Sequence, residues 1–186
     1  MRKIYLIKHA APLVHPGIPT DQWPISRGGK GKARELADQL ATAEIVAVAC
    51  SPEPKAEQTA QILASTLGVE SQSFPGLHEH ERRKVPVMAT PEYISAMAQV
   101  FLHPDQLILG EETATQALQR FAGAYEQVLA QHSEGNLAIV SHGTVIALFI
   151  ASISHENAFA IWRRMSLPSF VVIEEPEHLL LQNPGT

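Results

Sequence analysis

The chain has 186 residues, of which 45% are hydrophobic and 18% are charged, with a formal net charge of −5. These values suit a single folded domain, and they exclude a disordered acidic chain and a basic nucleic-acid-binding arm. The single cysteine, Cys50, excludes an internal disulfide framework and is typical of a reducing compartment. The longest apolar run, 137–153, is interrupted by Ser141-His142-Gly143, so it does not resemble a membrane span. We therefore expect a cytoplasmic protein with no membrane or nucleic-acid partner.

Short apolar runs alternate along the chain with longer amphipathic stretches. The runs 4–7, 45–49 and 137–140 lack polar alternation, which is typical of strands buried on both faces of a parallel sheet. Apolar residues at helical spacing predict helices in the stretches 33–40, 56–67 and 114–128. Helix-start and helix-end residues agree with these predictions: Gly68, Thr90-Pro91-Glu92 and Thr113.

This order of elements predicts an α/β fold: a mainly parallel central sheet flanked by helices on both faces. Near the end of the chain, 170–174 and 179–182 flank a turn and predict a small hairpin at the sheet edge. We expect residues 1–186 to form one domain. An irregular stretch around 74–111 is long for a plain connector, which predicts a pocket lid or insertion.

Reactive side chains follow each of the three predicted strands. The pairs are Lys8-His9, Cys50-Ser51 and Ser141-His142. Ligands of parallel sheets bind beyond the carboxyl ends of the strands, so two histidines there favour a shared site. After the second strand, the prolines at 52 and 54 predict a helix start with Lys55 in its first turn, where free N–H groups favour an anion.

These residues resemble the histidine phosphatase superfamily, also called the phosphoglycerate-mutase-like family. The motifs that carry the resemblance, in chain order, are Lys8-His9-Ala10, Pro24-Ile25-Ser26 with Gly29 and Ala33, Ser51 to Ala60, Leu77-His78-Glu79, Glu112-Thr113 with Arg120, and Ser141-His142-Gly143. A single such motif is weak, but six in order over most of the chain are specific.

The resemblance implies a phosphatase that hydrolyses a small phosphomonoester. His9 would form a phosphohistidine, and His142 would supply positive charge to the phosphate pocket together with Lys8 and Lys55. Glu79 would be the general acid and base, with Glu81 as the fallback acid. The phosphate ligands that it implies are Lys8, Lys55, His15 and the backbone N–H groups of Gly143 and Thr144. We expect no metal and no cofactor, because the cationic pocket supplies the charge. The sequence specifies no oligomeric state.

Two departures from the family pattern bear on activity. Lys8 and Lys55 stand where the family has arginines. Lysine keeps the charge but loses the planar, two-pronged contact of a guanidinium. Losing one charge-assisted hydrogen bond costs about 1.5–3 kcal/mol. The chain could therefore be a slow enzyme, an enzyme with a shifted substrate, or a phosphate-binding protein without turnover.

Three further interpretations concern the segment around Glu79. His78-Glu79-His80-Glu81 resembles a metal-ligand cluster and suggests a metal hydrolase as an alternative. A mutase is the lesser alternative, because the residues after Glu79 differ from the Glu-Arg-His-Tyr-Gly of that branch. The basic trio Arg82, Arg83 and Lys84 would either recruit an acidic substrate or form a solvated charge run.

Overall fold

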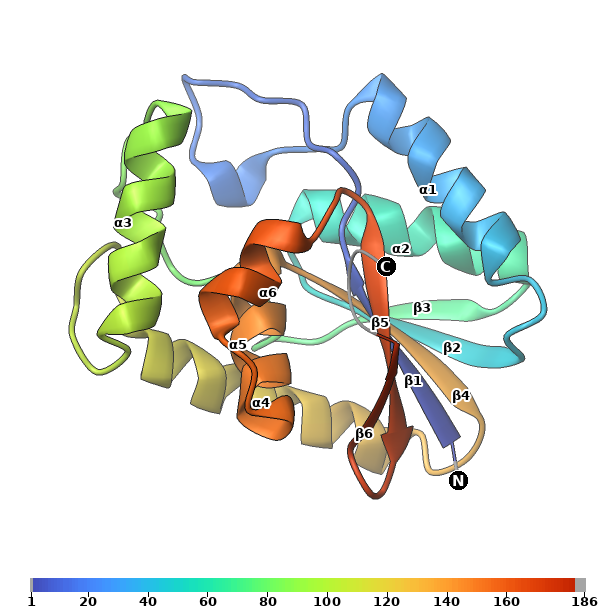
Figure 1. The fold of residues 1–186 in the computed structure, drawn as a ribbon. Coiled ribbons are helices and arrows are strands. Elements are labelled where there is room, and N and C mark those ends of the chain that lie inside the picture. Colours follow the sequence, from blue (N-terminus) through green and yellow to red (C-terminus); the bar gives the residue numbers. More distant parts are fainter. Residues whose placement is uncertain (1, 183–186) are drawn as a thin grey trace.

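A computed structural model describes residues 2–182 and shows one six-stranded sheet in the order β3-β2-β4-β1-β5-β6 (Figure 1). The strands are β1 (Arg2–Lys8), β2 (Ile45–Cys50), β3 (Glu70–Ser73), β4 (Asn136–Ser141), β5 (Ser169–Glu175) and β6 (Leu179–Gln182). β1 to β4 are parallel, whereas β5 pairs antiparallel with β1, and β6 pairs antiparallel with β5. The predicted α/β class, the mainly parallel sheet and the terminal hairpin are confirmed.

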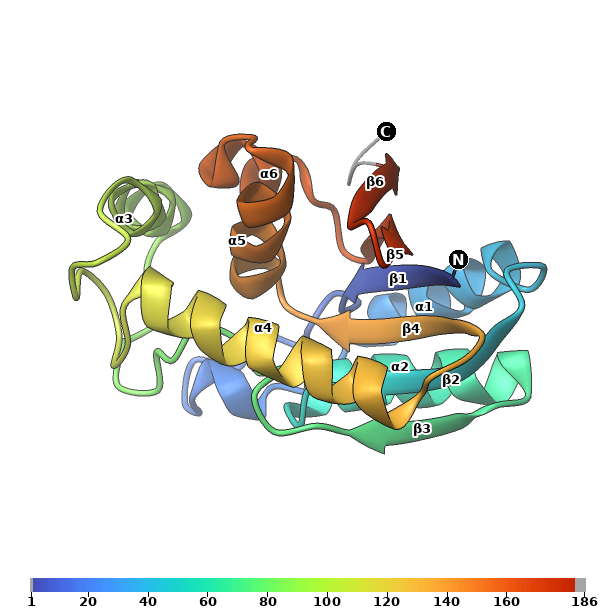
Figure 2. The ribbon, with the colours of Figure 1, turned by 90° about the horizontal axis from the view of Figure 1, so that it is seen from below.

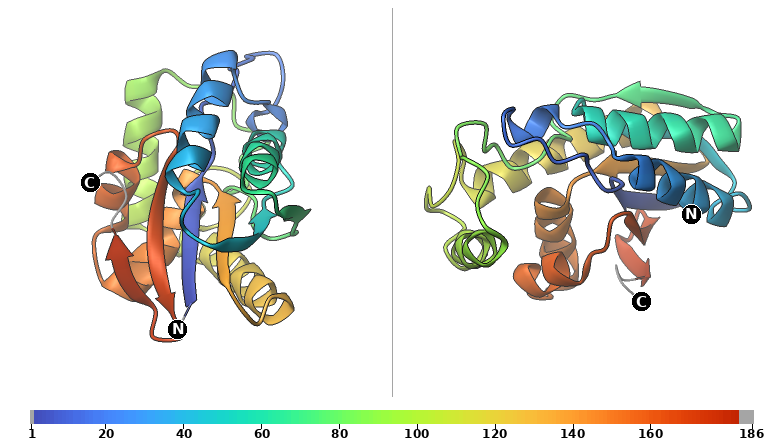
Figure 3. Two further views of the ribbon diagram at one scale, coloured as in Figure 1. Left: turned by 90° about the vertical axis from the view of Figure 1, so that its right-hand side faces the viewer. Right: turned by 90° about the horizontal axis from the view of Figure 1, so that it is seen from above.

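Helices cover both faces of the sheet, as Figure 2 shows. The helices are η1 (Thr20–Gln22), α1 (Arg27–Gln39), α2 (Pro54–Leu67), α3 (Thr90–Leu102), α4 (Ala114–Gln131), α5 (Gly143–Ser154) and α6 (Ala158–Arg164). α1 and α2 lie side by side on one face (Figure 3), and α4 and α5 pack on the other. None of the helices within 2–182 is long and apolar enough to cross a bilayer.

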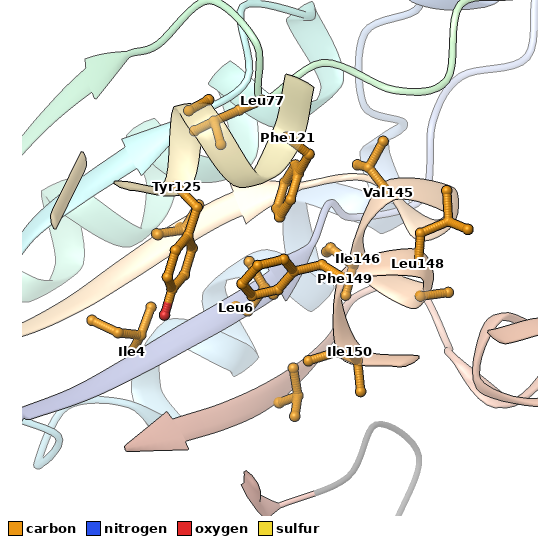
Figure 4. Close-up of a cluster of buried hydrophobic side chains, with 14 of the residues drawn as sticks. Ile4, Leu6, Leu77, Phe121, Tyr125, Val145, Ile146, Leu148, Phe149 and Ile150 are labelled. Atoms are coloured by element: carbon orange, nitrogen blue, oxygen red, sulfur yellow. The ribbon is translucent and has the colours of Figure 1, made fainter. Parts of the chain in front are cut away.

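Each face of the sheet has its own hydrophobic core, because successive side chains of a strand point to opposite faces. Ile7 of β1 packs with Leu36 of α1 and Leu63 of α2. Ile4 and Leu6 face the opposite way and join the larger cluster, which includes Phe121, Tyr125 and Phe149 (Figure 4). β1 must therefore be apolar on both faces, which explains its uninterrupted run of apolar residues.

The edge strand β3 has no counterpart among the strands that the sequence predicts. Its residues are Glu-Ser-Gln-Ser, and all of them are exposed. It pairs only with β2, through the backbone, so it needs no apolar side chains and leaves no hydrophobic pattern. The short helices η1 and α6 were not predicted either.

The irregular stretch around 74–111 contains α3, which lies beyond the carboxyl ends of the parallel strands (Figure 2). Side-chain carboxylates at and just after the end of the stretch hold its earlier part in place. Glu112 accepts a hydrogen bond from Glu81 N at 2.9 Å, and Glu111 accepts from Arg83 N and Lys84 N at 3.0 Å. The residues after β3 are therefore held in place although they form no regular element.

Candidate active site

His9 and His142 lie together because β1 and β4 are paired in register up to Lys8 and Ser141. His9 N then donates to Ser141 O at 3.0 Å, which extends the ladder beyond the last strand residue. The two imidazole rings make an edge-to-face contact, with their centroids 5.1 Å apart. Side chains that are 133 positions apart in the numbering thus meet at the carboxyl edge of the sheet.

The surroundings of His9 favour a neutral imidazole with one free ring nitrogen. Its Nδ1 lies 2.8 Å from the carbonyl oxygen of Ala10, which can only accept, so Nδ1 carries the proton and donates it. The other nitrogen, Nε2, therefore keeps its lone pair. Burial, reinforced by the charges of Lys55 and Lys8, lowers the pKa of His9 to about 4. At neutral pH this side chain has the form that a nucleophile requires.

His142 is fully buried beside His9. Its Nε2 lies 2.7 Å from the Ser51 hydroxyl and 3.6 Å from Glu53 Oε1. Burial and the nearby charge of Lys55 lower its pKa well below the usual value, so this ring is also neutral and does not supply the positive charge expected of it. Its ring does not line the cavity described below, and it contacts the site through the His9 ring and Glu53.

Two ammonium groups flank His9. Lys8 Nζ donates to Met165 O at 3.0 Å, and burial lowers the pKa of Lys8. Gly143 makes room for Lys8, because a Cβ there would lie 3.2 Å from Lys8 Cε. Lys55 lies in the first turn of α2, as predicted, and its Nζ contacts Glu53 Oε2 at 2.5 Å and Thr20 O at 2.7 Å.

Glu79 reaches the same place from the irregular segment after β3. One carboxylate oxygen accepts from His80 N at 2.8 Å, and the other accepts from Thr144 N at 3.2 Å, in the first turn of α5. Burial alone would raise the pKa of Glu79, but the Arg82 guanidinium and these N–H donors lower it below its usual value. Without a ligand, Glu79 is therefore an ionised carboxylate.

These side chains line a cavity of about 320 Å³. Its charged and polar part includes Lys8, His9, Thr20, Lys55, Glu79 and Arg82. Its remaining wall is mainly apolar and includes Trp23, Val85, Pro86, Met88, Tyr93 and Trp162. The arrangement can hold a small anion against a neutral imidazole, with an apolar group beside it.

Comparisons with known proteins bear on this geometry. The model of the histidine phosphatase superfamily (branch 1) matches residues 4–177. The chain belongs to this family. No curated protein matches it.

Several solved structures have the same fold. Bacillus stearothermophilus YhfR superposes with a TM-score of 0.80 at 19% identity, covering 100% of this chain and 97% of the other. The mycobacterial glucosyl-3-phosphoglycerate phosphatase complexed with VO3 gives 0.82 at 16%, covering 100% of both chains. Entamoeba histolytica phosphoserine phosphatase with 3-phosphoglyceric acid gives 0.79 at 16%, covering 100% and 98%. At these identities the likeness shows the fold.

Two of the residues that the family resemblance implies for the site, His15 and the fallback acid Glu81, lie outside the cavity, and Thr144 contacts the site in a different way from the one implied. His15 is in an exposed loop, accepts a hydrogen bond from Gly17 N, and does not line the cavity. Thr144 is fully buried, and its N–H donates to Glu79 rather than pointing freely at an anion. Glu81 contacts His78 at 3.3 Å and lies outside this cavity, so of the two candidate acids only Glu79 is on its wall.

The alternative interpretation of His78-Glu79-His80-Glu81 as a metal centre finds no cluster in the structure. Within residues 2–182, no group of three or more His, Cys, Asp or Glu side chains is arranged to hold a metal ion. His80 Nε2 instead lies 2.8 Å from the backbone oxygen of Glu112.

Sequence reasoning assigned no role to Glu53, and it treated Arg82 only as a member of a basic trio that would recruit an acidic substrate or form a solvated charge run. Glu53 is buried, forms the ion pair with Lys55 and accepts from Glu79 N at 2.8 Å. Its only signal was a charged residue between two prolines. Arg82 lines the cavity, but in the sequence it is part of a run with Arg83 and Lys84, and charge alone does not separate the buried member from the exposed ones.

Proposed function

We propose that the protein is a metal-independent phosphatase that hydrolyses a small phosphomonoester through a phosphohistidine on His9. The observation that carries the proposal is the state of the His9 ring. Its Nδ1 proton is held by Ala10 O, its pKa is lowered to about 4, and it lines a cavity with two ammonium groups. A neutral nucleophile beside fixed cations is what attack on a phosphate anion requires.

In the first step, His9 Nε2 forms a bond to phosphorus while the bond from phosphorus to the ester oxygen breaks. Glu79 gives its proton to the departing oxygen, which leaves as an alcohol. In the second step, a water molecule attacks phosphorus, Glu79 takes one of its protons, and the P–N bond breaks. Inorganic phosphate is released, and His9 and Glu79 return to their starting forms.

Glu79 must carry a proton to act as the acid. The charges of the site explain how substrate binding leads to this protonation. Lys8, Lys55 and Arg82 against Glu53 and Glu79 leave a net charge of +1 when both histidines are neutral. A phosphate dianion exceeds this charge and would raise the pKa of the nearby carboxylate. Substrate binding is thus coupled to the uptake of the proton that Glu79 then donates.

One observation favours a second candidate, a phosphate-binding protein without turnover. Both ammonium groups already have partners, since Lys55 is paired with Glu53 at 2.5 Å and Lys8 donates to Met165 O. A substrate would have to compete with these contacts. The two candidates differ in whether a covalent phosphoenzyme forms.

The test uses a ³²P-labelled phosphomonoester with quenching after a short incubation. We expect an acid-labile phosphoenzyme in the wild type and in His132→Ala, a control that removes a histidine at the end of α4. His9→Ala should carry no label. Label that persists in His9→Ala would remove His9 from this role, and vanadate binding without label or hydrolysis would establish the second candidate. Loss of turnover in EDTA would overturn metal independence.

A further inference from the structure

Two arginines near the site differ in how fully their donors are used. Arg120 donates to Gly76 O at 2.7 Å and to His78 O at 2.9 Å, and it pairs with Glu112 at 2.5 Å. Among residues 2–182, the contacts of Arg82 with oxygen atoms are long, at 3.4 Å to Thr144 Oγ1 and at 3.7 Å to Glu79 Oε2. A charge-assisted N–H···O bond is ~2.7–2.9 Å long. Arg120 is therefore saturated, whereas Arg82 keeps unused donors.

The unused donors of Arg82 lie in a mostly dry place. Its side chain is only 12% exposed, and its third contact, at 3.3 Å, is with the weak acceptor Met97 Sδ. Burying a guanidinium without strong acceptors is unfavourable unless a partner binds there. The acceptor that this arginine lacks is therefore to be sought in what the cavity binds.

The guanidinium is also held in a fixed orientation. Its carbon lies 5.4 Å from the centroid of the Tyr93 ring, a cation–π contact that orients the group without using an N–H donor. On either side in the chain, Glu81 N and Arg83 N are fixed by the carboxylates of Glu112 and Glu111. Arg82 is thus positioned before any ligand binds, which reduces the cost of binding one.

Arg82 lines the same cavity as His9 and both lysines, and it is the one arginine among residues 2–182 that does so. The ammonium groups of Lys8 and Lys55 are engaged with Met165 O and Glu53. A lysine also presents a point charge, whereas a guanidinium offers two parallel N–H donors that match the spacing of phosphate oxygens. The donor geometry for a phosphoryl group is therefore found on Arg82.

We propose that Arg82 is a catalytic residue of this phosphatase, whose guanidinium binds the phosphoryl oxygens of the substrate and of its transition state. The inference rests on the proposed function and names a further group that binds the phosphate. The ligand class is a tetrahedral or trigonal-bipyramidal oxyanion, so inorganic phosphate and vanadate should bind in the same way.

The test measures vanadate and phosphate dissociation constants together with kcat/KM for phenyl phosphate in Arg82→Met and Arg82→Lys. Arg82→Met should weaken vanadate binding and lower kcat/KM by about ten- to hundred-fold. Arg82→Lys should recover only part of the vanadate affinity and of kcat/KM, because lysine restores the positive charge but not the two parallel N–H donors. Added guanidinium chloride should restore part of the activity of Arg82→Met. The control is Arg83→Met, since Arg83 is 64% exposed and pairs with Asp21, and it should stay within twofold of wild type.

The opposing hypothesis is that Arg82 acts only through Glu79. Under that hypothesis Arg82→Met changes the pH dependence of turnover while vanadate affinity stays at the wild-type value and guanidinium rescues nothing; this result overturns the proposal. If Arg82→Met does not fold, the affinity of Arg82→Lys for vanadate makes the same decision. A wild type that binds vanadate through Arg82 but forms no phosphoenzyme would refute the proposed hydrolysis alone, whereas one that binds neither anion would refute both.

Discussion

The two sides of the cavity are held in place by different kinds of contact. The strand-end side, Lys8 and His9, is fixed by backbone hydrogen bonds of the sheet, the last of which joins His9 N to Ser141 O. The segment side, Glu79 and Arg82, belongs to no helix or strand. It depends on Arg120, which donates to the carbonyl oxygens of residues 76, 78 and 79, and on the Glu111 and Glu112 carboxylates. Distant substitutions should therefore disturb the segment side more than the strand-end side.

The largest expected effect comes from the proposed acid, Glu79. Glu79→Gln should slow hydrolysis of alkyl phosphates by about 10²- to 10⁴-fold, because Glu79 is the one carboxyl group among the described residues of the cavity wall and an amide does not protonate a poor leaving group. With p-nitrophenyl phosphate, whose leaving group needs little protonation, the loss should be less than about tenfold. Steady-state kinetics on both substrates measure the difference. Glu81→Gln is the matched control, and an equal selective loss there would transfer the role to Glu81.

The Arg120→Met substitution tests the anchor of the segment side. It breaks a mostly buried ion pair with Glu112 and leaves three backbone carbonyls without their donor. We expect the free energy of unfolding to fall by about 3 kcal/mol and turnover to fall with it. Urea unfolding and kcat measure the two effects. Lys32→Met, which breaks the exposed Lys32–Glu35 pair, should cost less than about 1 kcal/mol. Equal losses in both variants would contradict the comparison.

The Gly110→Ala substitution tests the segment side more directly, because Gly110 packs against the backbone of that segment. Its φ is +93°, and a Cβ there would lie 2.0 Å from Glu81 O. Gly110→Ala should therefore cost about 1–3 kcal/mol of stability and displace the turn before Arg82. Gly123→Ala is the control, since a Cβ meets nothing within 4 Å and alanine favours a helix, so that variant should be slightly stabilised. Thermal unfolding with activity assays separates them; wild-type activity in Gly110→Ala would refute this account.

The smallest expected effect concerns the strand-end side and is the pH dependence of stability that arises from His9. The pKa of His9 is about 4 in the folded protein and near its ordinary 6.5 when unfolded, so between these values only the unfolded chain binds the proton. Stability should therefore fall as pH drops below 6.5, by about 1 kcal/mol between pH 7 and 5.5 for one such group. Urea unfolding at both pH values measures it. His9→Gln should show a shallower decline and His132→Gln the wild-type one; identical curves for all three would contradict the lowered pKa.

The same contrast explains how far the sequence could predict the molecule. The strand-end side follows from apolar runs that end in Lys8-His9 and Ser141-His142, because parallel strands bring such ends together. The edge strand β3 carries no apolar signal, so the pattern missed it. Within the site, Arg82 and Arg83 are neighbours of one type, and only tertiary packing places the first in the cavity and the second in solvent.

Glu53 and Thr144 show a second limit. The sequence indicated an anion site at the first turn of α5, and the structure places an anion there, but it is the protein's own Glu79 carboxylate at 3.2 Å from Thr144 N. Similarly, Lys55 reaches its predicted place and meets Glu53. Which internal acid occupies a cationic position depends on side-chain geometry, and a linear motif does not encode it.

One consequence follows from the course of the segment between Glu79 and Tyr93. This single stretch supplies Glu79, the Arg82 guanidinium and the apolar lining at Val85 and Met88, while His9, the proposed nucleophile, directly follows β1. The residues that would select the leaving group and the histidine that would accept the phosphoryl group therefore lie on separate segments of the chain. Replacing this stretch while keeping the contacts to Glu111 and Glu112 should change the range of esters that bind. The His9 imidazole should keep its position at the end of β1.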